Sequence, residues 1–278
     1  MAGEALELTI ASDGTVLSGE QAGEGPPIVL LHGLSATRRY VVMGSRALER
    51  SGHRVISYDA RGHGRSDPAR DSDYSYEQLA GDLAAVLEQT GAQPAVLAGA
   101  SMGAHTAVRF ALDHPERVAA LALITPAFDP DSSATGEELA HWDALADGLR
   151  NGGVEGFIRA YDLDAVPERW RATLETVLRQ RLALHEHPEA VADALEAVPR
   201  SRPFETIAQL GDIRVPSTVI ASRDEADPGH PLAVGQSYAA AIPGAELVVE
   251  DASEPPRSPI AWQGGQLAKI LLSLADRV

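Results

Sequence analysis

The most restrictive segment of this sequence is a short apolar run that passes through a glycine-flanked serine directly into a helix. The run is Ala95–Ala98, the turn is Gly99-Ala100-Ser101-Met102-Gly103, and the following residues predict a helix over 102–113. Side chains two residues to either side of the serine would meet neighbouring backbone, which explains the glycines. The segment therefore predicts a sharp, strained strand-to-helix turn that raises the Ser101 hydroxyl above a sheet edge, facing the N-terminus of the helix.

Strand and helix signals alternate over most of the remaining chain. Two short strands at 4–10 and 15–20 read as a hairpin around Ser12-Asp13-Gly14. Continuous apolar runs predict buried strands at 27–31, 53–58, 118–124, 215–221 and 246–249. Helices are predicted at 37–50, 76–90, 232–242 and 262–276, the second with Ser75 and Gln78 at capping-box spacing and Gly91 as its end. The alternation predicts an α/β fold with a mostly parallel central sheet covered by helices on both faces.

The alternation breaks at Pro126. From there to about residue 212 the chain reads as helical segments with no convincing strand. We therefore predict a core domain formed by residues 1–125 and 213–278, with a helical cap of residues 126–212 inserted into it. The cap is expected to lie over the carboxyl ends of the strands.

The charge balance of the chain limits the kinds of partner and substrate that it is expected to bind. Acidic residues outnumber basic ones 40 to 23, a net charge of −17, which disfavours nucleic acid and membrane surfaces. The same charge disfavours highly anionic substrates unless Arg61, Arg65 or another local cation reverses the field. The sequence has no cysteine, no apolar run long enough to cross a bilayer and no secretory signal at its start, so we expect a cytoplasmic protein. Oligomeric state is not readable.

A second motif, His32-Gly33-Leu34, closes the strand at 27–31. We expect the backbone N–H groups of Leu34 and Met102 to form a two-donor oxyanion hole for a tetrahedral intermediate. The His32 imidazole is expected to be structural, held by hydrogen bonds.

Three pieces together resemble the α/β-hydrolase fold superfamily, in its esterase-like and haloperoxidase-like branch: His32-Gly33, the stretch Asp59-Ala60-Arg61-Gly62-His63-Gly64-Arg65-Ser66, and the glycine-flanked Ser101. They occur in the order and spacing of that family. The resemblance implies that Ser101 is a nucleophile, that the 59–66 stretch is chiefly structural, and that a helical cap follows the sixth strand.

The resemblance leaves the acid and the base open. The family's acid follows its seventh strand, where Asp224, Glu225 and Asp227 all compete. We rank Asp224 slightly first, with Asp227 as the alternative acid if His230 is the base, and Asp129 as an outside candidate. The family's histidine follows its eighth strand, but this sequence has no histidine after His230. His230 is therefore the best substitute. Histidines at 141, 185 and 187 are each expected at the surface, and no metal or cofactor site is predicted.

These observations predict a serine-dependent hydrolase acting on a small ester, lactone or thioester through an acyl-enzyme at Ser101, with His230 as base and Asp224 or Asp227 as acid. The missing histidine motivates an alternative, a ligand-binding or sensing protein on a hydrolase scaffold. A non-hydrolytic lyase is a third possibility. Substrate identity is not readable from the sequence.

Overall fold

The computed structural model describes residues 5–132, 135–223, 227, 229–250 and 262–278. Its centre is an eight-stranded sheet in the order β1-β2-β4-β3-β5-β6-β7-β8. The pairs β1–β2 and β2–β4 are antiparallel, and every other neighbouring pair is parallel. The strands are β1 (Leu6–Ser12), β2 (Thr15–Ala22), β3 (Pro27–Leu31), β4 (Arg54–Tyr58), β5 (Ala95–Ala100), β6 (Val118–Ile124), β7 (Ser217–Ala221) and β8 (Glu246–Val249).

Eight α-helices connect or flank these strands in the described part of the chain. They are α1 (Ala47–Arg50), α2 (Tyr76–Thr90), α3 (Met102–Asp113), α4 (Gly136–Ala160), α5 (Glu168–Leu182), α6 (Pro188–Ala197), α7 (Leu232–Ala241) and α8 (Gly264–Ala275). The predicted α/β class and mostly parallel sheet are confirmed. Helix α2 begins where Ser75 accepts the N–H of Gln78 and ends at Gly91 in the left-handed conformation, as its cap residues predict.

One predicted helix is wrong. Residues 37–50 form a short 3₁₀ turn (Arg38–Tyr40) and the single-turn helix α1 instead of one continuous helix. Met43 and Gly44 both adopt positive φ, at 49° and 72°, which ends helical geometry between the two turns. The apolar residues in this segment belong to a folded loop that covers the sheet.

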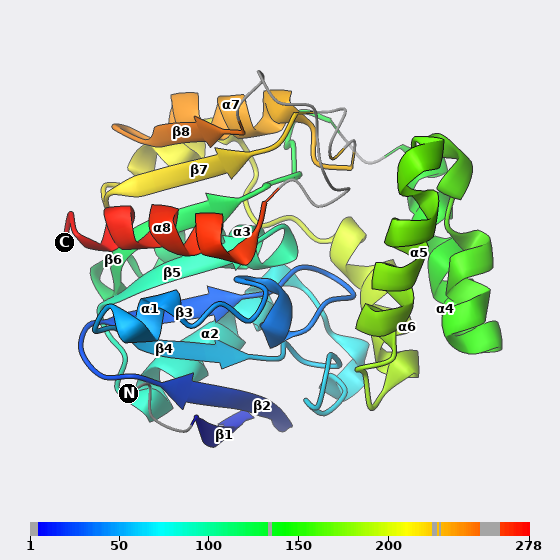
Figure 1. Cartoon of the computed structure of the whole chain (residues 1–278), viewed down its shortest axis with the longest axis horizontal. Helices are drawn as coiled ribbons and strands as arrows, with labels where there is room; N and C mark the ends of the chain where they lie inside the picture. Colours follow the sequence, from blue (N-terminus) through cyan, green and yellow to red (C-terminus); the bar gives the residue numbers. More distant parts are fainter. Residues whose placement is uncertain (1–4, 133–134, 224–226, 228, 251–261) are drawn as a thin grey trace.

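Alternate residues of the parallel strands face two separate cores. In β3, Val29 and Leu31 join a cluster with α2, α3 and α7, whereas Ile28 and Leu30 join a cluster with α1 and α8. Both faces are therefore covered, and this explains why these strands read as continuous apolar runs. Figure 1 shows α8 and α1 on the near face of the sheet.

Helices α4, α5 and α6, here called the α4–α6 segment, lie beyond the arrowheads of the central parallel strands (Figure 1). They have an apolar core of their own, which includes Leu145, Leu149, Phe157, Leu178 and Leu195. Half-buried Leu34 packs against that core from the loop after β3. The segment thus covers the edge of the sheet at which the parallel strands end.

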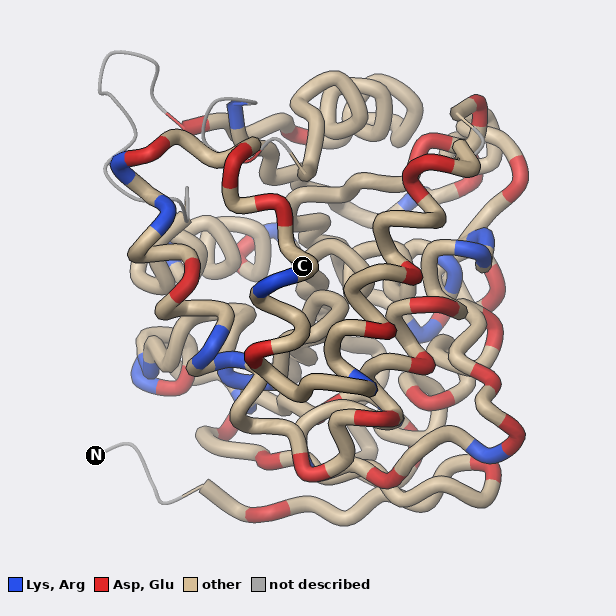
Figure 2. Tube along the Cα trace, turned by 90° about the vertical axis from the view of Figure 1, so that its right-hand side faces the viewer, with Lys and Arg blue, Asp and Glu red and all other residues tan. Residues whose placement is uncertain are grey.

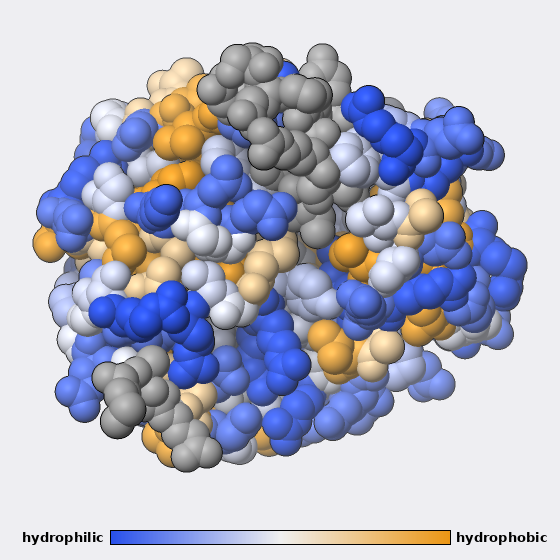
Figure 3. All heavy atoms as spheres, viewed as in Figure 1, coloured by the Kyte–Doolittle hydropathy of each residue, from blue (hydrophilic) through white to orange (hydrophobic). Residues whose placement is uncertain are grey.

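Acidic positions are spread along the whole chain in Figure 2, with basic ones between them. The face shown in Figure 3 is mostly hydrophilic, with apolar residues in small groups. Among the described residues, no helix has the length and apolar character required to span a membrane.

Candidate active site

Ser101 occupies the turn between β5 and α3 in a strained backbone conformation. Its φ is 50° and its ψ is −113°, a region that side-chain-bearing residues rarely adopt. The flanking glycines are required by contact: a Cβ at Gly99 would lie 2.2 Å from the Gly103 carbonyl oxygen, and a Cβ at Gly103 would lie 2.3 Å from that of Leu31. The predicted sharp turn is therefore present, and it leaves Ser101 partly exposed at the carboxyl end of β5.

His230 lies against the Ser101 hydroxyl. The distance from His230 Nε2 to Ser101 Oγ is 2.9 Å, and from His230 Nδ1 to Asp227 Oδ1 it is also 2.9 Å. With the proton on Nδ1, the imidazole donates to the carboxylate and accepts the serine O–H. The three side chains form one continuous hydrogen-bonded chain, although Ser101 and His230 are 129 positions apart.

The sequence offers three other candidate acids: Asp224, Glu225 and Asp129. Asp224 and Glu225 lie outside the described residues. Asp129 accepts the N–H of Asp131 through its Oδ1 and so closes its own turn. Asp227 is the carboxylate that the described residues bring to His230.

The end of β8, where the resemblance led us to expect a histidine, contributes Glu250. Its Oε1 accepts the backbone N–H of Arg223 at 2.7 Å, and the carbonyl of Arg223 accepts the N–H of Asp227 at 3.1 Å. Glu250 thereby ties the loop after β7, which carries Asp227 and His230, to the neighbouring strand. The side chain stabilises the position of this loop.

The loop after β3 touches the serine turn. A Cβ at Gly33 would lie 3.4 Å from both Ser101 Cβ and the Ala100 carbonyl oxygen, which is van der Waals contact, so Gly33 lies directly against the serine turn. Leu34 follows directly, and Met102 is the first residue of α3, where a backbone N–H has no partner within the helix. The structure thus brings both segments that carry the predicted oxyanion donors next to Ser101.

His32 is structural, as predicted. Its Nε2 accepts the N–H of Ala60 at 2.9 Å, so Nδ1 carries the proton and donates to the Gly33 carbonyl at 2.8 Å. Burial lowers its pKa below the ordinary value, which favours this neutral form. Both ring nitrogens are therefore engaged in holding the loops after β3 and β4.

His105 has a role that sequence reasoning missed. Its Nε2 accepts the N–H groups of Ala127 and Phe128 at 3.0 and 3.1 Å, and its Nδ1–H donates to Tyr76 Oη at 2.9 Å. Burial, followed by the nearby His230, lowers its pKa to about 3. This neutral imidazole fixes the loop after β6 beside the candidate site. The available signal was its position four residues after Ser101 on the same helix, which places both on one side.

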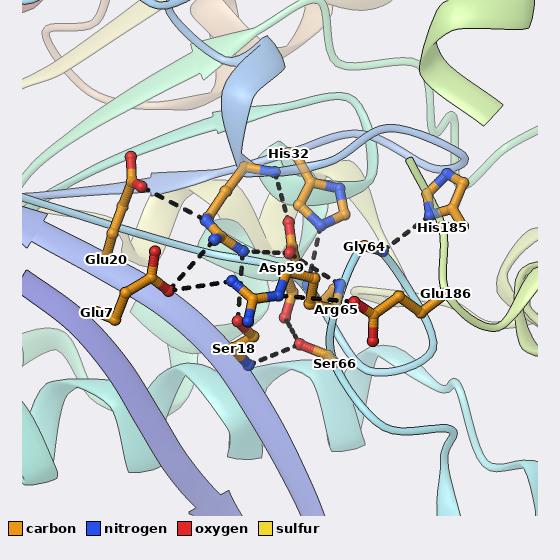
Figure 4. A network of polar contacts seen from close by, with 12 residues as sticks. Glu7, Ser18, Glu20, His32, Asp59, Gly64, Arg65, Ser66, His185 and Glu186 are labelled. Carbon is orange, nitrogen blue, oxygen red and sulfur yellow. Dashed lines mark hydrogen bonds and ion pairs between the residues drawn. The ribbon is translucent and has the colours of Figure 1, made fainter. Parts of the chain in front are cut away.

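The stretch 59–66 forms the polar network drawn in Figure 4. Asp59 lies at its centre: it pairs with the guanidinium of Arg38 and accepts the backbone N–H groups of Arg38 and Arg65. Ser66 Oγ donates to the Asp59 carbonyl and accepts the N–H of Ser18. The network joins the loop after β3, the loop after β4 and the loop between α5 and α6. It does not include Ser101, in agreement with the structural role implied by the resemblance.

The two cations named from the sequence are already paired. Arg61 binds Asp82 through two hydrogen bonds of 2.8 Å, with both side chains buried. Arg65 is half exposed and lies 3.4 Å from Glu7 and 3.7 Å from Glu186. A different arginine, Arg181 of α5, reaches the loop after β3, where its Nη2 donates to Ser35 Oγ at 2.9 Å.

The expectation that His185 lies at the surface is wrong. His185 is buried between α5 and α6, its Nδ1 accepts the N–H of Gly64 at 2.8 Å, and its Nε2 donates to the Ser35 carbonyl at 3.1 Å. The burial has a physical reason, since the ring ties the α4–α6 segment to the loops after β3 and β4. His141 is exposed, as predicted. Among the described residues, no group of three or more His, Asp or Glu is arranged to hold a metal ion.

Comparison with known proteins agrees with this architecture. The family described as alpha/beta hydrolase fold matches residues 26–255. A putative carbamate hydrolase RutD from Variovorax paradoxus (strain S110) is 30% identical over 217 residues, which cover 73% of this chain and 75% of that protein.

Two solved structures are similar over most of their length. One is a thermophilic esterase from Thermogutta terrifontis (malate bound), with a TM-score of 0.72, 28% identity and coverage of 89% of this chain and 90% of that one. The other is the enol-lactonase from Burkholderia xenovorans LB400, with a TM-score of 0.73, 26% identity and coverage of 97% and 100%.

The chain therefore belongs to the α/β hydrolase fold family, and the predicted resemblance is confirmed. Its relatives are hydrolases and esterases, which makes this protein a hydrolase of that family.

Proposed function

We propose that the protein is a serine hydrolase that cleaves a small ester, lactone or thioester through an acyl-enzyme at Ser101. The observation that carries the proposal is the chain Asp227–His230–Ser101, with 2.9 Å between partners at both links. A serine hydroxyl needs a base within hydrogen-bond reach, and that base needs an acceptor to orient it. Similar proteins include an esterase and an enol-lactonase, which supports the ester and lactone classes.

The chemistry follows from the positions of these groups. His230 Nε2 takes the proton of Ser101 as Oγ bonds to the substrate carbonyl carbon, and the backbone N–H groups of Leu34 and Met102 stabilise the resulting oxyanion. The protonated imidazole then gives its proton to the departing alkoxide oxygen or thiolate sulfur as the carbonyl–leaving-group bond breaks, so that the leaving group becomes an alcohol or a thiol. Water attacks the acyl-enzyme with His230 again as base, releasing the acid and restoring the Ser101 hydroxyl.

The observation that motivated the alternative of a ligand-binding protein no longer favours it. It was raised because no histidine follows β8, but a histidine from the loop after β7 lies at hydrogen-bond distance from Ser101. Strands β7 and β8 are parallel neighbours, so the ends of both lie at the same edge of the sheet.

Active-site labelling tests the proposal. A fluorophosphonate probe should label the wild-type protein at Ser101, and Ser101→Ala should abolish the labelling. His230→Ala should reduce both labelling rate and p-nitrophenyl acetate turnover at least about 1,000-fold, because the serine loses its base. His141→Ala, which removes an exposed imidazole from α4, is the matched control and should behave as wild type. Undiminished turnover in His230→Ala would contradict the assignment of the base.

A further inference from the structure

Arg181 has an unusual environment for an arginine of this protein. It lies in the last turn of α5, its Nη2 donates to Ser35 Oγ at 2.9 Å, and its Nε is shielded from solvent without a hydrogen-bond partner in the structure. Burial lowers its pKa below the ordinary value, but a guanidinium stays protonated at neutral pH. The protein thus holds a positive charge on a partly buried side chain whose Nε is shielded from solvent.

This charge has no carboxylate counter-ion among the described residues. The two ionisable groups that act on its pKa, Tyr161 and Tyr40, are phenols and not carboxylates. The two fully buried arginines differ from Arg181, since Arg38 pairs with Asp59 and Arg61 with Asp82. The chain has 40 acidic residues, so a pairing carboxylate would have been easy to supply. Withdrawing a charge from water without a counter-ion is destabilising, so the lack of a carboxylate partner calls for a functional reason.

Arg181 borders the candidate active site. It is bound to Ser35, the residue after Leu34, in the loop whose Gly33 lies against Ser101. Burial raises the pKa of half-buried Tyr161, and Arg181 and Asp227 are both near enough for their charges to act on that pKa. Arg181 therefore lies beside the candidate oxyanion loop, and it comes from the α4–α6 segment, which lies beyond the strand ends (Figure 1).

The position of Arg181 is pre-organised through Ser35. Ser35 is buried with φ of 58°, its carbonyl accepts from His185 at 3.1 Å, and its N–H donates to His63 at 3.4 Å. Its hydroxyl is thus an anchored acceptor that orients one N–H of the guanidinium. The remaining N–H groups, including Nε–H, keep the planar arrangement that matches a carboxylate.

We propose that Arg181 binds a carboxylate of the substrate, so that the preferred substrates are esters or lactones whose short acyl part carries a second, free carboxylate. The inference rests on the proposed function, since it names the substrate class for the same site. In this arrangement the acyl carbonyl oxygen binds the backbone N–H of Leu34, and Arg181 is bound to Ser35, the next residue. A short acyl chain is therefore enough to connect the carbonyl group to a carboxylate at Arg181. The net charge of −17 repels anions in general, and this local cation provides the exception.

A pair of esters of matched shape tests the proposal. Monomethyl succinate carries the free carboxylate, and methyl levulinate replaces it with a neutral acetyl group of similar size. Methanol release is followed by NMR, and hydrolysis of monomethyl succinate takes up one water to give succinate and methanol. The wild-type protein should prefer monomethyl succinate in kcat/KM. Arg181→Met should lose about 30-fold or more on that ester, because a desolvated ion pair is removed, and less than about 3-fold on methyl levulinate.

The matched control is Arg179→Met on the same helix. Arg179 is partly exposed and pairs with Glu155 and Glu175, so its removal deletes one positive charge without touching the site. It should leave the ratio between the two esters unchanged. Equal losses on both esters in Arg181→Met, or a wild-type preference for methyl levulinate, would overturn the proposal and leave Arg181 as a link between helix α5 and the loop after β3.

A binding measurement separates this proposal from the proposed function. Monomethyl succinate should bind the Ser101→Ala protein at least about 30-fold more tightly than the Ser101→Ala, Arg181→Met double variant in calorimetric titration. If the wild-type protein is neither labelled by fluorophosphonate nor active on either ester, the serine mechanism fails while this comparison still tests the carboxylate site. Equal affinity of the two variants overturns the role of Arg181 even if Ser101 is a nucleophile.

Discussion

Replacing Asp227 with asparagine tests which carboxylate orients the base. The side chain keeps its shape, but the amide N–H₂ offered to His230 Nδ1 favours the wrong tautomer of the imidazole. In a fully buried triad this exchange lowers kcat about 10⁴-fold. Asp227 and His230 are 28% and 27% exposed, so water replaces part of the lost acceptor. We therefore expect a smaller loss of about 10²- to 10³-fold, which corresponds to about 3–4 kcal/mol of transition-state stabilisation.

The assay is kcat/KM for p-nitrophenyl acetate, together with the rate of fluorophosphonate labelling at Ser101. Asp224→Asn is the rival variant, because Asp224 ranks first by sequence position and lies outside the described residues. We expect it to stay within about 3-fold of wild type, and both variants should melt within a few degrees of it, because both exchanges are nearly isosteric. Near-normal activity of Asp227→Asn combined with collapse of Asp224→Asn would refute the reasoning.

Two further predictions concern stability. Gly99→Ala would place a Cβ 2.2 Å from the Gly103 carbonyl oxygen and should destabilise the fold by about 3 kcal/mol or more, measured as a much lower Tm. The control is Gly265→Ala in α8, where a Cβ would have nothing within 4 Å, and this variant should have an unchanged or higher Tm. Equal Tm values for the two variants would contradict the contact argument. Burial lowers the pKa of His185 to about 4 and that of His63 well below its ordinary value. The unfolded chain therefore binds more protons than the native state, and stability should fall as pH drops from about 6.5 toward 4, by up to about 1.4 kcal/mol per pH unit per histidine. Urea unfolding at pH 8, 6 and 5 checks this: the pH dependence should be weaker in His185→Gln and unchanged in exposed His141→Ala, and a flat profile in the wild-type protein would count against it.

The sequence by itself determined the elements that depend on local patterns. Helix α3 and strands β6 and β8 have the bounds that their apolar runs predict, and the helix after Ser75 ends at Gly91 as its caps require. Double burial explains the success of the strand predictions, because a strand covered on both faces is apolar at every position. The error at 37–50 has the opposite cause: Met43 and Gly44 leave helical geometry within a segment whose apolar residues pack as a folded loop.

Only the tertiary structure decided which side chains meet. His230 could be named as a substitute base, but its contact with Ser101 depends on the path of the loop after β7 across 129 positions of sequence separation. Arg181 and Ser35 are 146 positions apart, and no local pattern distinguishes Arg181 from the other arginines of α5. Hydrophobic periodicity and helix-capping residues carry information about local structure only, within a few residues along the chain. The pairing of charges and imidazoles is set by how loops from different strands and the α4–α6 segment pack together, and this is a property of the whole fold.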